Sequence, residues 1–189
     1  NPFSINQWFW DVDTNGSIDH NSASTQHLFL FPGTGFHEVE LRVEDTYGCT
    51  DSLTKSMKVH PQPNAIIASV NACLNDQVAV YDSSVVDTSN IVNWVWDMGT
   101  GDTLYNQNNN YLYTTFGTKT ITLIVVSNDQ CRDTTSSNVR VYELPTANFE
   151  FQDTCEYEQL LVTSTSSEGD TTISVYEWHF GDLSASQFR

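Results

Sequence analysis

The chain of 189 residues repeats itself at a spacing of 82 positions, which limits it to a tandem array of similar modules. The pairs that keep this spacing are Trp96 and Trp178, Cys49 and Cys131, Cys73 and Cys155, and Pro63 and Pro145. Trp10 precedes Trp96 by 86 positions, so the first copy carries four extra residues between Trp10 and Phe29. The repeat predicts the C-terminal part of one module at residues 1–61, a complete module at 62–144, and the N-terminal part of another at 145–189.

Each copy contains an aromatic residue two positions before a tryptophan, and an acidic turn follows. The three instances are Trp8 to Asp13, Trp94 to Asp102 and Tyr176 to Asp182. Side chains two positions apart on a strand point to the same side, so each aromatic pair should share one face. Exposed aromatic rings could bind sugars, but a central strand favours packing. The predicted core tryptophans are Trp10, Trp96 and Trp178.

Alternating apolar residues predict half-buried antiparallel strands. Within residues 37–44, Val39, Leu41 and Val43 point one way and charged residues the other. The second copy repeats this pattern with Ile121, Leu123 and Val125. Further strands are predicted at residues 5–10, 28–31, 57–59, 65–70, 78–80, 94–96, 111–113 and 139–141. Because no segment has a helical period, we expect an all-β fold of antiparallel β-sandwiches stacked end to end.

Composition excludes some classes of partner. The chain has 24 acidic and 7 basic residues, and its formal net charge is −17. Because phosphate binding requires clustered Lys and Arg, we expect no nucleic-acid partner. The longest apolar run, residues 121–126, is too short to span a bilayer, so we expect no membrane insertion. Since the sequence starts inside a repeat, we expect it to be a portion of a longer array.

The copies resemble the PKD (polycystic kidney disease) domain. That family opens with a Pro-x-Ala-x-Phe strand, continues through a Trp-Asp-Phe-Gly-Asp-Gly turn, and then has an aromatic residue and a Gly before a Val-x-Leu-x-Val strand. The matching segments here are 145–149 for the opening, 96–99 and 178–182 for the turn, and 113–125 for the last part. The turn departs from the pattern, because Met98 stands in place of the Phe and His179 in place of the Asp.

The resemblance implies immunoglobulin-like sandwiches in an extracellular protein, at the cell surface or secreted. PKD repeats usually act as spacers or mediate adhesion and contact with carbohydrate or protein. The variant with Gly48-Cys49 is similar to long arrays of Bacteroidetes-type bacteria, some of which are giant adhesins of gliding motility exported by the type IX pathway. We therefore expect a structural spacer or stalk of a cell-surface adhesin filament. Its expected partners are neighbouring repeats, surface glycans or other surface proteins.

Two other functions stay open at this point. One is a module that itself binds carbohydrate or protein, and the other is an accessory domain of a secreted hydrolase. The chain itself is not expected to be an enzyme, because no nucleophile motif is present and Asp11 with Asp13 is a loop pair without a companion acid. The histidines do not recur at equivalent positions; they are His20, His27, His37, His60 and His179.

Calcium is the one cofactor that the sequence suggests. The segment from Asp11 to Asp19 places oxygen-bearing side chains at alternate positions and Gly at the sixth, as in the start of a calcium-binding loop. The predicted ligands are Asp11, Asp13, Asn15 and Asp19. The four extra residues of the first copy lie in this region. The twelfth position is Ser22 rather than a bidentate Glu, and no helix flanks the segment, so an ordinary exposed loop is the alternative.

The four cysteines suggest an oxidising, extracellular setting. In a sandwich of this type, the loops that hold Cys73 and Cys131 lie at opposite ends, farther apart than a disulfide allows. We therefore expect bonds between consecutive repeats, with partners outside this sequence. This expectation covers Cys49, Cys73, Cys131 and Cys155. Buried free thiols are the alternative.

The resemblance to Bacteroidetes-type proteins also implies O-glycosylation at Asp-Ser/Thr-apolar or Asp-Thr-Thr triplets. The candidate sites are Ser52, Thr103, Thr134 and Thr171. Ser52 and Thr134 occupy the same position of the repeat. Because the chain is rich in Asp, Ser and Thr, such triplets also arise by chance.

Overall fold

The computed structural model describes residues 4–180 and 185–188, with side chains described up to residue 180. Its strands are β1 (Ile5–Asp11), β2 (His20–Ser22), β3 (Gly35–Asp45), β4 (Thr50–Val59), β5 (Ile67–Ser69), β6 (Ala72–Cys73), β7 (Gln77–Asp82), β8 (Ile91–Asp97), β9 (Thr103–Leu104), β10 (Asn108–Leu112), β11 (Gly117–Ser127), β12 (Arg132–Tyr142), β13 (Phe149–Phe151), β14 (Val162–Ser164), β15 (Tyr176–His179) and β16 (Ala185–Phe188). The described residues contain no helix, and hence none that could cross a membrane. The prediction of an all-β fold is confirmed.

The chain divides into two compact units. The first comprises residues 1–62 with 87–89, and the second comprises 63–86 with 90–189. The division after residue 62 lies one position from the predicted start of the complete module. The second unit holds both the middle and the third copies, so the three-module boundaries stay a prediction.

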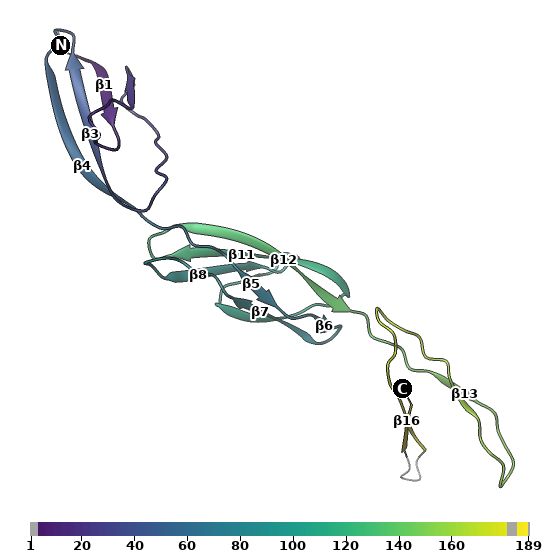
Figure 1. The fold of residues 1–189 in the computed structure, drawn as a ribbon. Coiled ribbons are helices and arrows are strands. Elements are labelled where there is room, and N and C mark those ends of the chain that lie inside the picture. Colours follow the sequence, from purple (N-terminus) through teal and green to yellow (C-terminus); the bar gives the residue numbers. More distant parts are fainter. Residues whose placement is uncertain (1–3, 181–184, 189) are drawn as a thin grey trace. The chain divides into compact units, whose positions relative to one another are not determined.

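The middle copy is a sandwich of two sheets (Figure 1). One sheet has the strand order β10-β7-β5, and the other has the order β6-β12-β11-β8-β9. The long pair β11–β12 is in register from Gly117 opposite Val141 to Val126 opposite Arg132. The sandwich is antiparallel as predicted, with one short exception, where β6 runs parallel to the end of β12. This exception arises because the chain crosses from β5 in one sheet to β6 in the other before it turns back into β7.

The alternating residues form the interior between the two sheets. The hydrophobic side chains that are fully or almost fully buried are Ala65, Val78, Val80, Trp96, Met98, Tyr113, Ile121, Leu123, Val125, Val139 and Val141. Trp96 is completely buried, and its Nε1 donates a hydrogen bond to the carbonyl of Asn106 at 3.0 Å. Trp94 lies on the same face but is only half-buried, with its Nε1 bonded to Asp82 Oδ2 at 2.7 Å. The polar edge of each indole therefore has a partner.

Tyr113 closes one side of this core. Its ring packs edge-on against Tyr111 with 4.7 Å between centroids, and its hydroxyl donates to the carbonyl of Met98 at 2.9 Å. Burial raises the pKa of Tyr113 to about 12, and the nearby hydroxyl of Tyr111 and carboxyl of Asp97 contribute in the same direction. In the folded protein the phenol therefore stays neutral at pH values above 10, where an exposed tyrosine ionises.

The repeat is also visible in the backbone of the cysteine-containing turns. The N–H of Asp45 bonds to the carbonyl of Cys49 at 3.0 Å, and the N–H of Ser127 bonds in the same way to that of Cys131 at 2.9 Å. The last residue before each cysteine has a positive φ, 79° at Gly48 and 66° at Gln130. Equivalent positions therefore adopt equivalent turns, although only one of the two is glycine.

The first copy forms a single four-stranded sheet with the order β2-β1-β3-β4. Strand β4 begins directly after Cys49 and is longer than the strand predicted from Met57. The predicted strand at residues 28–31 is absent, and Leu28 and Leu30 are almost fully exposed. Its counterpart in the middle copy, β10, pairs with β7. The positions equivalent to β7 would precede residue 1, so residues 28–31 have no ladder to join.

The third copy forms two short hairpins, β13–β14 and β15–β16. Trp178 lies on β15 and is half-buried, with its ring edge-on to Phe149 at 5.6 Å between centroids. Trp10 in the first copy is also half-buried, and its Nε1 has no hydrogen-bond partner among the described residues. Of the three tryptophans at this repeat position, only Trp96 lies inside a closed sandwich.

Replacing Leu123 by Ala should lower the free energy of unfolding of the middle copy by about 2–5 kcal/mol, because removing a fully buried side chain leaves a cavity. Leu41 occupies the same position in the first copy but is only half-buried, so Leu41→Ala should cost about 1 kcal/mol. Amide hydrogen exchange in β11 and β3 reports on each copy separately. An equal loss of unfolding free energy at the two positions would contradict the difference in burial between Leu123 and Leu41.

The raised pKa of Tyr113 predicts a loss of stability in alkali. Below pH 10 the phenol is neutral in both the folded and the unfolded chain, so its contribution is complete there. Between pH 10 and about 12 only the unfolded chain ionises, and stability should fall by at most about 1.4 kcal/mol per pH unit. Tyr113→Phe should make this decline shallower. Denaturant unfolding at several pH values from 9 to 12 measures the slope, and an unchanged slope would contradict the assignment.

Candidate functional site

An acidic loop follows β1 in the first copy. Asp11 is buried, with 3% of its surface exposed; its Oδ2 accepts the N–H of Gly16 at 2.9 Å and its Oδ1 that of Asp13 at 3.3 Å. Asp19 accepts the N–H of Val12 at 2.8 Å. One oxygen from each of Asp11, Asp13 and Asp19 lies within 4.8 Å of the others. The structure thus brings together three of the four predicted calcium ligands.

The fourth predicted ligand, Asn15, is engaged inside the loop. Its Nδ2 donates to Asp13 Oδ2 at 2.8 Å, and its Oδ1 accepts the N–H of Ser17 at 2.8 Å. These bonds orient the side chain along the loop. Sequence spacing alone could not distinguish this role from metal ligation, because a ligand and a turn-forming Asn have the same spacing.

The electrostatics of the loop keep Asp11 charged. Burial acts to raise the pKa of Asp11, but the backbone N–H groups of Gly16, Asp13 and Thr14 together outweigh it, so the pKa is below its ordinary value. A carboxylate that is ionised at neutral pH is the form that ligates a cation. The same hydrogen bonds also hold the loop in shape without an ion.

The equivalent loop of the middle copy lacks such a cluster. Asp97 stands in place of Asp11, and its Oδ1 accepts the N–H of Gly99 at 2.8 Å. Gly99 has a φ of 72°, and a Cβ there would lie 2.5 Å from the carbonyl oxygen of Thr120, so only glycine fits this close approach. The loop of the middle copy therefore packs tightly against β11, whereas the longer first-copy loop gathers carboxylates.

The acidic loop could hold Ca²⁺ through Asp11, Asp13 and Asp19. Calcium takes oxygen ligands at about 2.3–2.6 Å, so two ligands on opposite sides of the ion are at most about 5 Å apart. The 4.8 Å spread of the three carboxylate oxygens is compatible with this size. The chemistry available here is cation binding, which would stabilise the loop between β1 and β2.

Two histidines that the sequence treats as scattered lie side by side in the first copy. The rings of His20 and His27 have centroids 3.7 Å apart, and both face Phe29. Burial, with a further contribution from His20, lowers the pKa of His27. The pairing of His20 with Trp10 across β1 and β2 creates this contact. The repeat gave no signal for this contact, because Leu104, which pairs with Trp96 as His20 pairs with Trp10, is not a histidine.

The cysteines are all free thiols, and Cys131 is less exposed than the other three. Cys73 pairs with Tyr142 at the end of β12, while Cys131 directly precedes Arg132 at its beginning. Eleven strand residues separate the two ends, which corresponds to about 36 Å. A disulfide between Cys73 and Cys131 is therefore sterically excluded. Bonding between repeats stays a prediction.

The four candidate hydroxyl sites are exposed. Ser52 lies on β4 and Thr134 at the equivalent position of β12, Thr103 lies on β9, and Thr171 follows the ion-paired Asp170. Their accessibility is compatible with modification. Whether these residues carry glycans stays a prediction that peptide mass measurement would decide.

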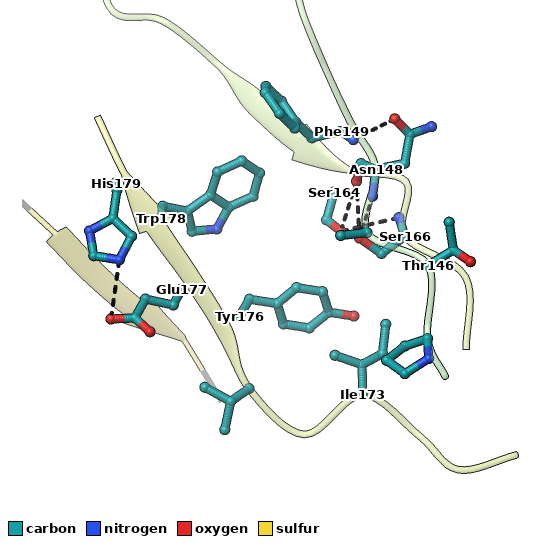
Figure 2. Close-up of a pocket in the computed structure, with 13 residues that line it drawn as sticks. Thr146, Asn148, Phe149, Ser164, Ser166, Ile173, Tyr176, Glu177, Trp178 and His179 are labelled. Carbon is teal, nitrogen blue, oxygen red and sulfur yellow. Dashed lines mark hydrogen bonds and ion pairs between the residues drawn. The ribbon is translucent and has the colours of Figure 1, made fainter. Parts of the chain in front are cut away.

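Two hollows lie on the sheet faces of the outer copies. The hollow in the third copy, of about 490 Å³, lies beside Phe149, Tyr176 and Trp178. Figure 2 shows Tyr176 and Trp178 projecting into it from β15, while Glu177 and His179 project from the opposite side of the strand. The hollow in the first copy, of about 520 Å³, is lined by the half-buried Trp10, Val39 and Leu41. The residues equivalent to Trp10, Val39 and Leu41 form the interior of the middle copy, so we interpret both hollows as inner sheet faces rather than ligand sites.

Calcium should raise the thermal stability of the first copy if the acidic loop binds it. At a calcium concentration of 100 times Kd, the expected gain is about 2.7 kcal/mol. Asp11→Asn should abolish the gain, whereas Asp97→Asn, the same change at the equivalent position of the middle copy, should leave it intact. Calcium titration followed by calorimetry measures both. Unaltered unfolding of the wild-type chain in calcium would show that the cluster is an ordinary loop.

Comparison with known proteins matched residues 58–141 to the family model of the PKD domain. Among solved structures, the chain is similar to the PKD1 domain of Vibrio anguillarum Epp, with 23% identity, a TM-score of 0.42, and coverage of 44% of this chain and 96% of that one. It is also similar to the PKD1 domain of the Vibrio cholerae metalloprotease PrtV, with 26% identity, a TM-score of 0.39, and coverage of 44% and 98%.

A third similar structure contains the fibronectin(III)-like modules of Clostridium thermocellum CbhA, with 9% identity, a TM-score of 0.43, and coverage of 76% of this chain and 81% of that one. A search of curated proteins found no match. The family model covers β5 to β11 completely and nearly all of β12, the strands that make up the closed sandwich. The match to the PKD domain family model therefore spans the closed sandwich of the middle copy.

Proposed function

We propose that the chain is a structural spacer within a long extracellular repeat protein, in which its copies carry load and set distance. The observation that carries this proposal is the closed middle copy, whose link to the next copy is very short. Strand β12 ends at Tyr142, and the next copy is already bridged at Thr146. A link of three residues leaves little freedom between successive modules. Such an arrangement suits extension better than capture of a ligand.

The arrangement of aromatic and reactive groups supports a role without catalysis. Trp96 is enclosed between the sheets, and Trp94 is half-buried and packs against the same core, so both indoles serve the interior of the module. The acidic loop gathers three carboxylates and has no adjacent nucleophile motif in the sequence. We therefore propose that the chain is not an enzyme and that its principal partners are neighbouring repeats.

The proposed setting is the surface of a Bacteroidetes-type bacterium, within an adhesin filament of the gliding-motility type. PKD domains are typically extracellular, and the net charge of −17 favours a well-hydrated surface. The exposed hydroxyls at Ser52, Thr103, Thr134 and Thr171 are compatible with glycans on such a surface. Surface glycans or proteins of other cells are further proposed partners of the complete filament.

Disulfides between consecutive repeats would strengthen this spacer. Cys73 lies beside Tyr142, at the end where the chain leaves the repeat. Cys131 lies at the end where the chain enters, because Asp133 accepts the N–H of Ala65 at 2.7 Å. In a longer array, a cysteine of each type would therefore meet at every junction. Non-reducing peptide mapping of a longer chain should find these bonds, and a chain that contains only free thiols would contradict them.

Stretching single molecules tests the spacer function. Pulled from its ends, the chain should release the middle copy in one step with a gain of at most about 290 Å, which is the extended length of 82 residues. A glycan array probed with the same chain should give no binding. Selective binding to one class of glycan would instead favour the carbohydrate-binding module, and gradual extension without a step would contradict a spacer made of closed modules.

A further inference from the structure

The link between the middle and third copies is held by a backbone bridge that recurs in the repeat, at Asn64 with Val85, and by further contacts that do not recur. Glu143 and Leu144 follow β12, and Thr146 then exchanges two backbone hydrogen bonds with Ser167, at 3.1 and 3.0 Å. This bridge brings the next loop of the third copy, residues 168–170, back to the link. The loop then contacts the end of the middle copy through a carboxylate and through a close backbone approach.

The carboxylate belongs to Asp170. Its Oδ2 accepts the N–H of Glu143 at 3.1 Å, and its Oδ1 forms an ion pair with Nη2 of Arg140 at 3.0 Å. The Asp170 side chain is 17% exposed and that of Arg140 is 41% exposed, so the carboxylate is the better shielded partner of the pair. Hydrogen bonds that involve charged groups are stronger than neutral ones. One side chain of the third copy thus engages both the backbone and a side chain of the middle copy.

Arg140 is itself positioned by the middle copy. Its Nη1 donates to Thr118 Oγ1 on β11 at 3.2 Å, and its backbone N–H donates to Asn71 Oδ1 at 2.9 Å. The bond to Thr118 orients the guanidinium, and the bond to Asn71 holds the backbone of Arg140, both within the middle copy. The ordering cost of the ion pair with Asp170 is correspondingly reduced, because one partner has already lost much of its freedom.

The close backbone approach involves Gly169. A Cβ at this position would lie 2.4 Å from the carbonyl oxygen of Glu143 and 3.0 Å from the carbonyl carbon of Leu144. Both are backbone atoms, which cannot swing aside as the end of a side chain can. Glycine is therefore required by the contact between the loop and the link.

The positions 82 residues earlier cannot make these contacts. In place of Arg140, Glu143, Gly169 and Asp170 they carry Lys58, Pro61, Asp87 and Thr88. Proline has no N–H to donate, threonine has no carboxylate, and aspartate has the Cβ that Gly169 lacks. The contacts of the Asp170 carboxylate and the close approach at Gly169 are therefore specific to this junction, whereas the backbone bridge of Thr146 with Ser167 is shared with Asn64 and Val85.

We propose that Arg140, Glu143, Gly169 and Asp170 form a docking interface whose partner is the next copy of the same chain, and that it sets the orientation of the third copy on the middle copy. The link at residues 143–145 is then a fixed joint. This interface stands whether or not the array acts as a spacer, because it follows from contacts across the link alone.

Replacing Asp170 by Ala in the full chain removes both contacts of the carboxylate. Exchange of the Glu143 amide hydrogen should become at least tenfold faster, while exchange of the Leu123 amide in β11 stays unchanged. Residual dipolar couplings from the middle and third copies should fit one alignment tensor in the wild-type chain and two in the variant. Asp153→Ala removes an exposed carboxylate from the same copy and should behave like the wild type.

Arg140→Gln removes the ion pair from the side of the middle copy and leaves the sequence of the third copy unchanged. If Asp170→Ala unfolds the third copy, Arg140→Gln tests the interface in its place. Its residual dipolar couplings should also fit two alignment tensors and not one. The interface is overturned if the wild-type chain already needs two tensors, or if the couplings of Arg140→Gln and of folded Asp170→Ala still fit one. Faster exchange at Glu143 together with separate tensors supports it.

Discussion

Burial of the inner face of β11 beneath β7 is the interaction on which the closed module depends. Ile121, Leu123 and Val125 are completely buried there, opposite Val78 and Val80. Each such side chain contributes about 1.5–3 kcal/mol when fully removed from water. Strand β3 of the first copy has the same alternation, yet its inward residues are only half-buried because no second sheet covers them. An alternating strand is therefore not enough to form a closed core, because a second sheet must also cover its apolar face.

Much of the fold could be read from periodicity, since alternation and the 82-residue spacing both record which side chains share a face. The strands β3, β8 and β11 follow this pattern directly. The prediction of a strand at residues 28–31 is wrong, because local apolar character does not reveal whether a neighbouring strand is present. The parallel pairing of β6 was missed because two residues carry no periodicity. Tertiary context decided both cases.

In the candidate sites too, the sequence predicts some features, and others depend on tertiary contacts. Oxygen-bearing residues at alternate positions correctly placed Asp11, Asp13 and Asp19 in one cluster, because a short loop restricts where its side chains can go. The bonds of Asn15 to its neighbours, the contact of His20 with His27, and the ion pair of Arg140 with Asp170 depend on chain geometry that spacing does not encode. For the last pair, the sequence signal was the departure from the repeat at Arg140 and Asp170, whose counterparts are Lys58 and Thr88.

The parallel pairing of β6 with β12 has a mechanical consequence. Ala72 and Cys73 lie opposite Val141 and Tyr142, and the N–H of Leu74 bonds to the carbonyl of Tyr142 at 2.8 Å. Tension that enters at Ala65 and leaves at Glu143 pulls these two strands in opposite directions along their length. Their hydrogen bonds then lie across the direction of pull and are sheared together instead of being unzipped one by one. These few parallel hydrogen bonds must therefore break together before tension can separate the two sheets and expose the hydrophobic interior.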